Sequence, residues 1–206
     1  APDPRPGLVT KEVRKGQGNR SQTVLAFHDS LEYNRLNRHR LRSMTEVLNM
    51  KLREDLREKR GAVYSVRAQS TASGRPDQLY RVIVVYGSSP DSADVLADAV
   101  FDHVDSLKTH LADQDYVDRV KEQQRRGRET AMETNGFWAG ILSYYYSHDD
   151  EDLLDVLRYD ELIDSLTREE IREAARKYLN TSHYVKVVLY PEPSFGPRRQ
   201  PSGLGP

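Results

Sequence analysis

The sequence predicts an α+β domain, in which a mainly antiparallel sheet of about five strands has helices packed on one face. Two observations lead to this prediction. Segments with strand character and segments with helical periodicity follow one another in the order ββαββααααβ, which contains too few strand-helix-strand crossovers for a doubly wound sheet. Charged residues make up 31% of the 206 residues and apolar residues 37%, which is typical of helices with strongly charged outer surfaces.

The first strands come from two short β segments, 8–13 and 23–27. The turn-prone run Lys15-Gly-Gln-Gly-Asn19 separates them, so we expect a hairpin. Asp29 or Ser30 then caps a helix that ends near Gly61, because glycine suits a helix C-terminus. The apolar residues of this helix recur at spacings of three and four, and they are Leu41, Met44, Leu48 and Leu52.

A second hairpin is predicted from segments 62–72 and 79–86, which are rich in β-branched and aromatic residues. The turn signal Ser73-Gly-Arg-Pro76 joins them. Asp91 and Ser92 then start a helix with a single apolar face. The residues of that face are Ala93, Leu96, Ala97, Val100, Val104, Leu107 and Leu111.

The second half of the chain is mainly helical. A stretch over 116–146 is expected to bend or break near Asn135-Gly136, and a further helix is expected over 152–166. Thr167 and Glu170 then form a capping box that opens another helix. A closing strand follows, in which Val185, Val187 and Leu189 alternate with more polar residues.

The two ends of the chain concentrate proline and glycine without periodicity. We therefore expect a flexible N-terminal tail over 1–7, a single folded domain over 8–190 and a C-terminal tail over 191–206. The first residue is Ala1 rather than methionine, so we expect a processed product or a part of a longer protein.

Composition excludes several function classes. The net charge of −1 gives no general attraction for polyanions, so we expect no nucleic-acid partner. The absence of cysteine excludes disulfide frameworks, thiolate catalysis and cysteine-ligated metals. The longest apolar run, 82–86, is far too short to span a bilayer, and no apolar signal core follows a basic start, so we expect no membrane insertion.

The histidines are too widely spaced to predict a zinc site. They are His28, His39, His103, His110, His148 and His183. No two lie closer than seven positions, and neither the H-E-x-x-H motif nor its inverse, H-x-x-E-H, occurs. Phosphate-binding glycine loops and the G-x-S-x-G nucleophile motif are also absent from the sequence. We expect no metal or cofactor site in this chain.

Basic residues cluster in two places, 35–42 and 125–128, and Arg35, Arg38 and Arg42 share a helix face. Nearby acidic residues balance the positive charge of both clusters, which favours a solvated helix face over an anion-binding site. These acidic residues are Glu32, Glu46, Glu122 and Glu129.

The segment 56–66, Leu-Arg-Glu-Lys-Arg-Gly-Ala-Val-Tyr-Ser-Val, has a more specific pattern. A helix ends there, turns at Gly61 and enters a strand, which places Arg57 on the last helical turn and Tyr64 near the start of the strand. A guanidinium and a phenol at such a junction can both donate hydrogen bonds to a carbonyl oxygen that is gaining negative charge. The alternative is an Arg facing the helix dipole and a Tyr packed inward.

With this segment the chain resembles the last domain of the pitrilysin/insulinase family of inverted-motif zinc metallopeptidases. The resemblance covers residues 8–190 and implies a processing-peptidase-like metallohydrolase domain. Besides 56–66, it is carried by Tyr86-Gly-Ser-Ser-Pro90, Asn135-Gly-Phe-Trp138 and the run 166–179 with its closing strand. In that family two homologous halves close around a peptide, and each half has two α+β domains. The first domain carries zinc, and the last contributes an Arg and a Tyr seven residues apart.

Arg57 and Tyr64 reproduce that spacing, so the resemblance implies that they are catalytic residues, contacting the substrate backbone and the oxyanion. Since this chain has no H-x-x-E-H motif, the zinc is expected in an upstream domain, and the chain alone is not expected to hydrolyse peptides. The implied partners are a peptide or protein substrate and the upstream peptidase domains or a partner subunit. A periplasmic or cell-envelope location follows from the family resemblance only.

Three hypotheses follow. The first is the C-terminal domain of a zinc metalloendopeptidase that binds extended peptide. The second is a non-catalytic scaffold or assembly subunit of the same fold, and an intact H-x-x-E-H motif upstream of Ala1 would separate the two. The third is an anion or nucleic-acid binder that uses the face of Arg35 to Arg42, which steep salt dependence of binding would favour.

Overall fold

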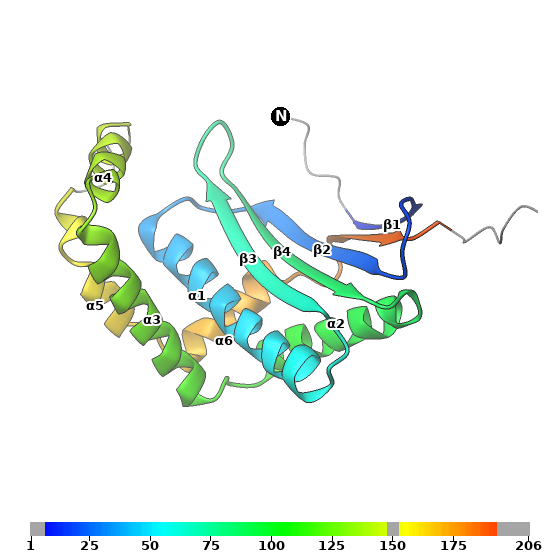
Figure 1. Ribbon diagram of the computed structural model, residues 1–206. Helices are drawn as coiled ribbons and strands as arrows, with labels where there is room; N and C mark the ends of the chain where they lie inside the picture. Colours follow the sequence, from blue (N-terminus) through cyan, green and yellow to red (C-terminus); the bar gives the residue numbers. More distant parts are fainter. Residues whose placement is uncertain (1–6, 148–152, 193–206) are drawn as a thin grey trace, which may run out of the picture.

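The computed structural model describes residues 7–147 and 153–192. Its strands are β1 (Leu8–Arg14), β2 (Ser21–Ser30), β3 (Ser65–Ser73), β4 (Leu79–Ser88) and β5 (Tyr184–Tyr190). Its helical segments are α1 (Arg35–Leu52), the π-helical η1 (Arg53–Lys59), the 3-10 turn η2 (Pro90–Ser92), α2 (Ala93–Thr109), α3 (Gln114–Met132), α4 (Asn135–Ser147), the 3-10 turn η3 (Leu153–Val156), α5 (Tyr159–Asp164) and α6 (Arg168–Tyr178). The α+β fold class is confirmed (Figure 1). Most of the two predicted tails lies outside the described residues.

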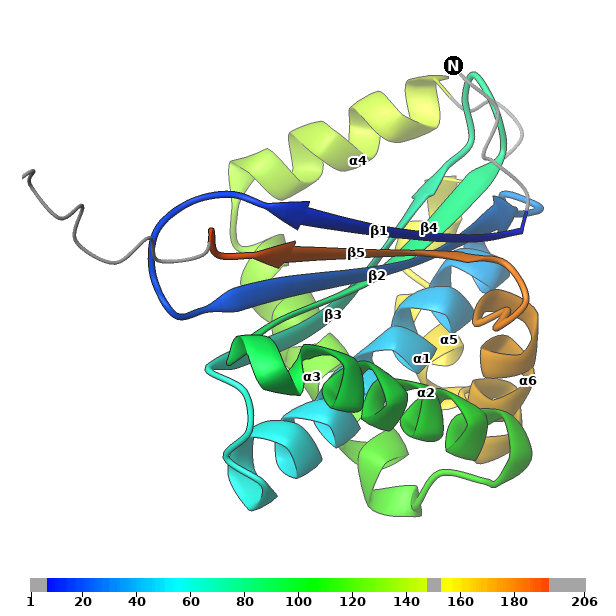
Figure 2. The ribbon, with the colours of Figure 1, turned by 90° about the vertical axis from the view of Figure 1, so that its right-hand side faces the viewer.

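The strands form one mixed sheet in the order β1-β5-β2-β4-β3. All neighbours are antiparallel except β1 and β5, which are parallel. The predicted β3-β4 hairpin is present, but the predicted hairpin of the first two strands is wrong because β5 lies between them (Figure 2). The closing strand carries more apolar residues than the polar, exposed β1, so its position inside the sheet buries more apolar surface and leaves β1 at the edge.

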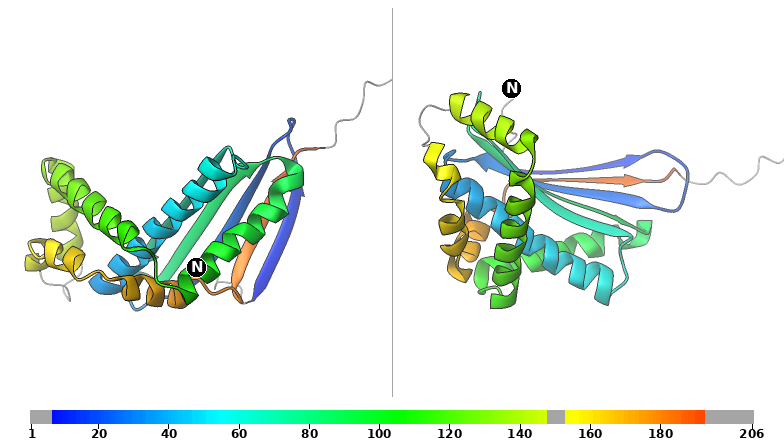
Figure 3. Two further views of the ribbon diagram at one scale, coloured as in Figure 1. Left: turned by 90° about the horizontal axis from the view of Figure 1, so that it is seen from below. Right: turned by 60° about the vertical axis from the view of Figure 1, so that its left-hand side comes forward.

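One face of the sheet is covered by α1, α2 and α6, and α3 and α5 form an outer layer against α1 (Figure 3). Strand alternation accounts for the core between these layers, because every second residue of β2 and β4 points at the helices. Leu25, Phe27, Val82 and Val84 are fully buried there, whereas Val24 and its neighbours on the opposite face are half-buried. The apolar stripe of α2 packs on the same core as predicted, except that Leu111 follows the helix and is half-buried.

Two helix boundaries differ from the prediction, and a third agrees with it. β2 continues to Ser30, so neither Asp29 nor Ser30 is free to cap α1, and Asn34 caps it instead by accepting a hydrogen bond from the N–H of Asn37 at 2.8 Å. The helical stretch 116–146 is broken before Asn135, as expected. The helix predicted over 152–166 is shorter, since its described part consists of η3 and α5.

Within the described residues, no helix is both long and apolar enough to cross a membrane.

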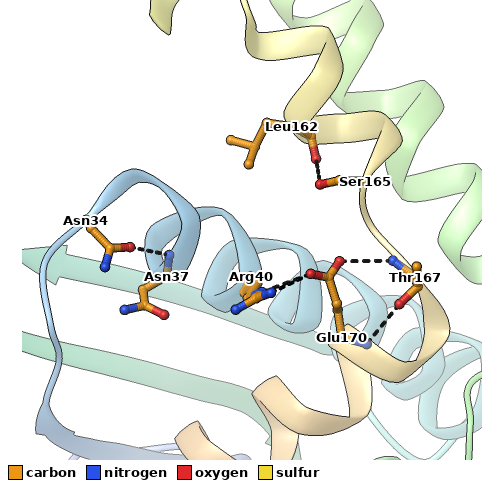
Figure 4. Close-up of polar contacts among 7 residues, drawn as sticks. All are labelled: Asn34, Asn37, Arg40, Leu162, Ser165, Thr167 and Glu170. Carbon is orange, nitrogen blue, oxygen red and sulfur yellow. Dashed lines mark hydrogen bonds and ion pairs between the residues drawn. The ribbon is translucent and has the colours of Figure 1, made fainter. Parts of the chain in front are cut away.

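The capping box that opens α6 is confirmed (Figure 4). The Thr167 hydroxyl accepts from the N–H of Glu170, and the Glu170 carboxylate accepts from the N–H of Thr167, both at 3.2 Å. The same carboxylate pairs with Arg40 of α1 at 2.6 Å. The start of α6 is therefore tied to α1, which lies directly on the sheet.

Thr167→Ala is expected to lower the free energy of unfolding by about 1 kcal/mol, because one N–H of the first turn of α6 loses its acceptor. Urea unfolding of the 206-residue chain measures this. Ser165→Ala is the matched control, since the Ser165 hydroxyl donates only to the Leu162 carbonyl at 2.9 Å and its removal leaves no N–H unpaired (Figure 4). A loss of peptide binding at unchanged stability would instead place the start of α6 in a binding site.

Candidate functional site

Two buried side chains hold the connection between α1 and β3 in place. Leu56 in η1 is 0% exposed, and Val63 just before β3 is 6% exposed. Arg57 and Tyr64 each come directly after one of these anchors, and both are exposed. The spacing of seven residues between Arg57 and Tyr64 is thus also the spacing between two fixed points of the core.

The turn between the anchors is closed by backbone hydrogen bonds. The N–H of Ala62 donates to the carbonyl of Leu56 at 3.0 Å, and the N–H of Arg60 donates to that of Asp55 at 3.0 Å. Gly61 has φ of 59°, a left-handed conformation that side chains other than hydrogen disfavour. The predicted helix end at Gly61 is therefore confirmed, and the turn is rigidly defined.

The Asp55 carboxylate of η1 connects this turn to α2. It pairs with Arg60 at 2.9 Å and with His103 at 2.9 Å. Partial burial alone would raise the pKa of Asp55, but the hydrogen bonds from Arg60 and His103 outweigh it, so the pKa lies below its usual range. Asp55 is thus held ionised as a structural group beneath the connection.

Tyr64 is 55% exposed, and its backbone is nevertheless fixed. Its N–H donates to the carbonyl of Gly87 at 2.9 Å, one residue beyond the β3-β4 ladder. The ring lies close to Gly87, since a Cβ at that position would be 3.9 Å from the Tyr64 Cδ2 atom. The guanidinium of Arg20 stacks on the ring, with its carbon 4.3 Å from the ring centroid. The phenol is therefore presented by a fixed backbone and a partly covered ring.

A groove of about 380 Å³ opens beside this ring, and we call it the Tyr64 groove. Its walls include Lys15, Gln17, Arg20, Tyr64, Val85 and Leu189. They come from the β1-β2 connection, from the start of β3 and from the sheet face that α1, α2 and α6 leave uncovered. The size is at the lower end of the range for ligand sites in proteins.

Arg57 is exposed on η1 and makes no hydrogen bond or ion pair with the residues of 7–147 and 153–192. It is not among the residues that line the Tyr64 groove. The structure thus places Arg57 and Tyr64 at the two ends of one rigid turn, with both side chains exposed, and Tyr64 is not sealed inward.

The sequence pattern did not predict Arg20, Lys15 or Gly87 as neighbours of Tyr64. Arg20 directly precedes β2, whose first residue, Ser21, is paired with Ser88 of β4. This register brings Arg20 to Tyr64 although the two are far apart in the sequence. The run Lys15-Gly-Gln-Gly-Asn19 indicates only a turn, and no local pattern indicates which part of the sheet a turn approaches.

The family resemblance implies zinc, and two histidines of this chain lie close together. The pairing of β2 with β5 brings His28 next to His183, which directly precedes β5, and their ring centroids are 4.7 Å apart. Asp29 is the carboxylate nearest to them, 3.8 Å from the Nδ1 atom of His183. Among the described residues, no three His, Asp or Glu side chains are grouped so that they could hold a metal ion. The residues present do not fit zinc.

The basic residues of α1 are largely engaged by carboxylates. Arg35 pairs with Asp155 at 3.1 Å, and Arg42 pairs with Glu46 at 2.8 Å. Arg38 stacks on the rings of Tyr33 and Tyr144. Arg35, Arg38 and Arg42 line a second groove of about 320 Å³ together with Arg128 and several tyrosines. The pairing agrees with the interpretation of these residues as a helix face balanced by acids.

Comparisons with known proteins identify the family. A family model described as the peptidase M16 inactive domain matches residues 1–124. No curated protein matches the chain.

Several solved structures have a fold similar to that of this chain. The periplasmic protease PqqL from Escherichia coli has a TM-score of 0.76 at 18% identity over 90% of this chain and 21% of that chain. A mutant of the ferredoxin protease FusC, in complex with Arabidopsis ferredoxin, has a TM-score of 0.77 at 19% identity over 91% and 21%. The peptidase M16 inactive domain from Pseudomonas fluorescens has a TM-score of 0.72 at 18% identity over 92% and 45%. This chain spans less than half the length of each of these chains.

The 206-residue chain is expected to retain no stoichiometric zinc after dialysis, because His28 and His183 lack a third ligand among the described residues. Elemental analysis of the dialysed protein measures this, with His110→Ala, on the exposed end of α2, as a control for adventitious surface binding. One zinc per chain that is lost in His28→Ala or His183→Ala would contradict the expectation.

Proposed function

Because this chain belongs to the family of peptidase M16 inactive domains, we propose that it is the zinc-free C-terminal domain of a zinc metalloendopeptidase. In this proposal it binds extended peptide and contributes Arg57 and Tyr64 to an active site that an upstream H-x-x-E-H domain completes. In this proposal the zinc is held upstream, and the part of this chain is to bind and orient the substrate and to stabilise charge.

The observation that carries this proposal is the exposed phenol of Tyr64 on a fixed backbone. A hydroxyl can donate one hydrogen bond to a carbonyl oxygen, and the bond strengthens as that oxygen gains negative charge. The guanidinium of Arg57 offers further donors, and it has no partner within the described part of the chain that would have to be displaced. Both groups sit on a turn pinned by the core, which favours a preorganised site over a mobile one.

Peptide binding is supported by the position of β3. It is an edge strand of nine residues, paired only with β4, and Tyr64 directly precedes it. An extended peptide can add to such an edge through main-chain hydrogen bonds, which require few specific side chains. The fold relative FusC is a ferredoxin protease whose structure contains ferredoxin, which favours a protein or peptide as the ligand class here.

A scaffold or assembly role is the second candidate, and the open face of the sheet favours it. Val24, Ile83 and Val185 lie on the face that α1, α2 and α6 leave uncovered, and they line a groove together with His28 and Arg81. Such a face fits contact with a partner subunit, as an assembly role requires. An intact H-x-x-E-H motif in an upstream domain would favour the peptidase, and an upstream domain that lacks this motif would favour the scaffold.

In the full-length protein, Tyr64→Phe is expected to lower kcat by roughly 100- to 1000-fold, because one donor to the developing oxyanion is lost. The fold should be unaffected, since the hydroxyl is exposed and the ring is kept. Steady-state hydrolysis of a peptide substrate measures the effect. Tyr146→Phe removes the hydroxyl of a tyrosine that is 88% exposed on α4 and serves as the matched control.

Arg57→Ala is expected to raise KM as well as to lower kcat, because a guanidinium holds a ground-state carbonyl as well as an oxyanion. Arg53→Ala, an exposed arginine earlier in η1, is the control for charge loss. The proposal fails if Tyr64→Phe turns over normally while Arg57→Ala only lowers the melting temperature, since that pattern belongs to a structural pair.

A further inference from the structure

The Tyr64 groove carries an excess of positive charge. Lys15 and Arg20 line it, and no Asp or Glu is among its lining residues. Neither cation forms an ion pair with another described residue. Over the whole chain acidic residues outnumber Lys and Arg by 32 to 31, and elsewhere arginines such as Arg40 and Arg119 pair with carboxylates at 2.6 and 2.8 Å. The wall of the Tyr64 groove therefore carries two cations that no carboxylate of the described residues pairs with.

Both cations are held in place by the backbone around them. The N–H of Lys15 donates to the carbonyl of Tyr190 at 3.0 Å, which ties the β1-β2 connection to the end of β5. Arg20 precedes Ser21, whose buried hydroxyl donates to the carbonyl of Ser88 at 3.2 Å. The backbone of the connection is thus fixed to β4 and β5 at its two ends, which places Lys15 and Arg20 beside the groove.

Stacking on Tyr64 also leaves the donors of Arg20 available. The guanidinium carbon lies over the ring, 4.3 Å from its centroid, and the N–H groups of a guanidinium lie around its edge. That edge is the part that binds a carboxylate through two parallel hydrogen bonds. The acidic residue bonded to this connection, Glu192, donates its backbone N–H to the carbonyl of Gly16 and does not line the groove.

We propose that the Tyr64 groove is a subsite for an acidic side chain of the substrate peptide, which Arg20 and Lys15 bind while the main chain passes Tyr64 along β3. This inference rests on the proposed function, because it assumes that an extended peptide binds beside Tyr64. It adds the chemical class of side chain that the domain selects, aspartate or glutamate, and two residues that perform the selection.

The test uses fluorescence anisotropy of the 206-residue chain with dye-labelled extended peptides of Ala, Thr and Val. One glutamate is moved along the peptide, and each peptide has a glutamine twin of the same shape. At one or two positions the glutamate peptide is expected to bind roughly 3- to 10-fold more tightly than its twin, a size typical of partly exposed charge pairs. The preference should shrink in about 0.5 M salt because the pairs are screened.

Arg20→Gln and Lys15→Gln are each expected to reduce the preference, and the double variant is expected to abolish it, so that glutamate and glutamine peptides bind the double variant equally. Arg75→Gln is the matched control, since Arg75 is an exposed arginine in the β3-β4 turn, at the far end of the hairpin from Tyr64. Circular dichroism melts of all variants establish that they are folded. If Arg20→Gln does not fold, Lys15→Gln alone tests the subsite.

The outcomes separate this inference from the proposed function. If glutamate and glutamine peptides bind equally at every position, or if the double variant keeps the preference, the acidic subsite is wrong and peptide binding stands. If no peptide binds the wild-type chain, both the proposed function and the subsite are overturned.

Discussion

The register between β2 and β4 is the constraint on which the site depends. β2 is the central strand of the sheet, and its pairing with β4 runs from Ser21 opposite Ser88 to Ser30 opposite Leu79. β3 pairs in turn with β4, and this places Tyr64 at the end of the sheet where β2 begins. A slip of one residue would exchange the two faces of β2, exposing Leu25 and Phe27 and moving Arg20 away from the Tyr64 ring. The core that fixes this register therefore also builds the groove.

Local patterns predicted most of the secondary structure because each element carries its own signal. The capping box of Thr167 and Glu170, the apolar face of α2 and the helix end at Gly61 all depend on residues within a few positions of one another. Arg57 and Tyr64 could be singled out for the same reason, since both lie in one short segment, 56–66, and the structure leaves both exposed. Their catalytic role stays a prediction.

The remaining features depend on contacts between distant parts of the chain. β1 and β2 are adjacent in sequence, and a turn joins them, yet β5 separates them because this last strand of the chain has more apolar surface to bury. Arg20 meets Tyr64, and His28 meets His183, only through strand pairings that no local pattern specifies. Local sequence thus predicted the elements, whereas their order in the sheet decided which side chains share a site.

Along the α1-β3 connection, the residues that stabilise the fold are different from those that are exposed for contact with a ligand. Leu56 and Val63 are buried and hold the turn, whereas Arg57 and Tyr64, the residues after them, lie outside the core. Burial of the two anchors contributes on the order of 2 kcal/mol each, and the exposed polar groups contribute little to the free energy of unfolding. A polar group can be left unpaired at such a position without the cost of burial. The fold therefore does not depend on the Arg57 guanidinium or on the Tyr64 phenol, and both are available for the substrate contacts that we propose.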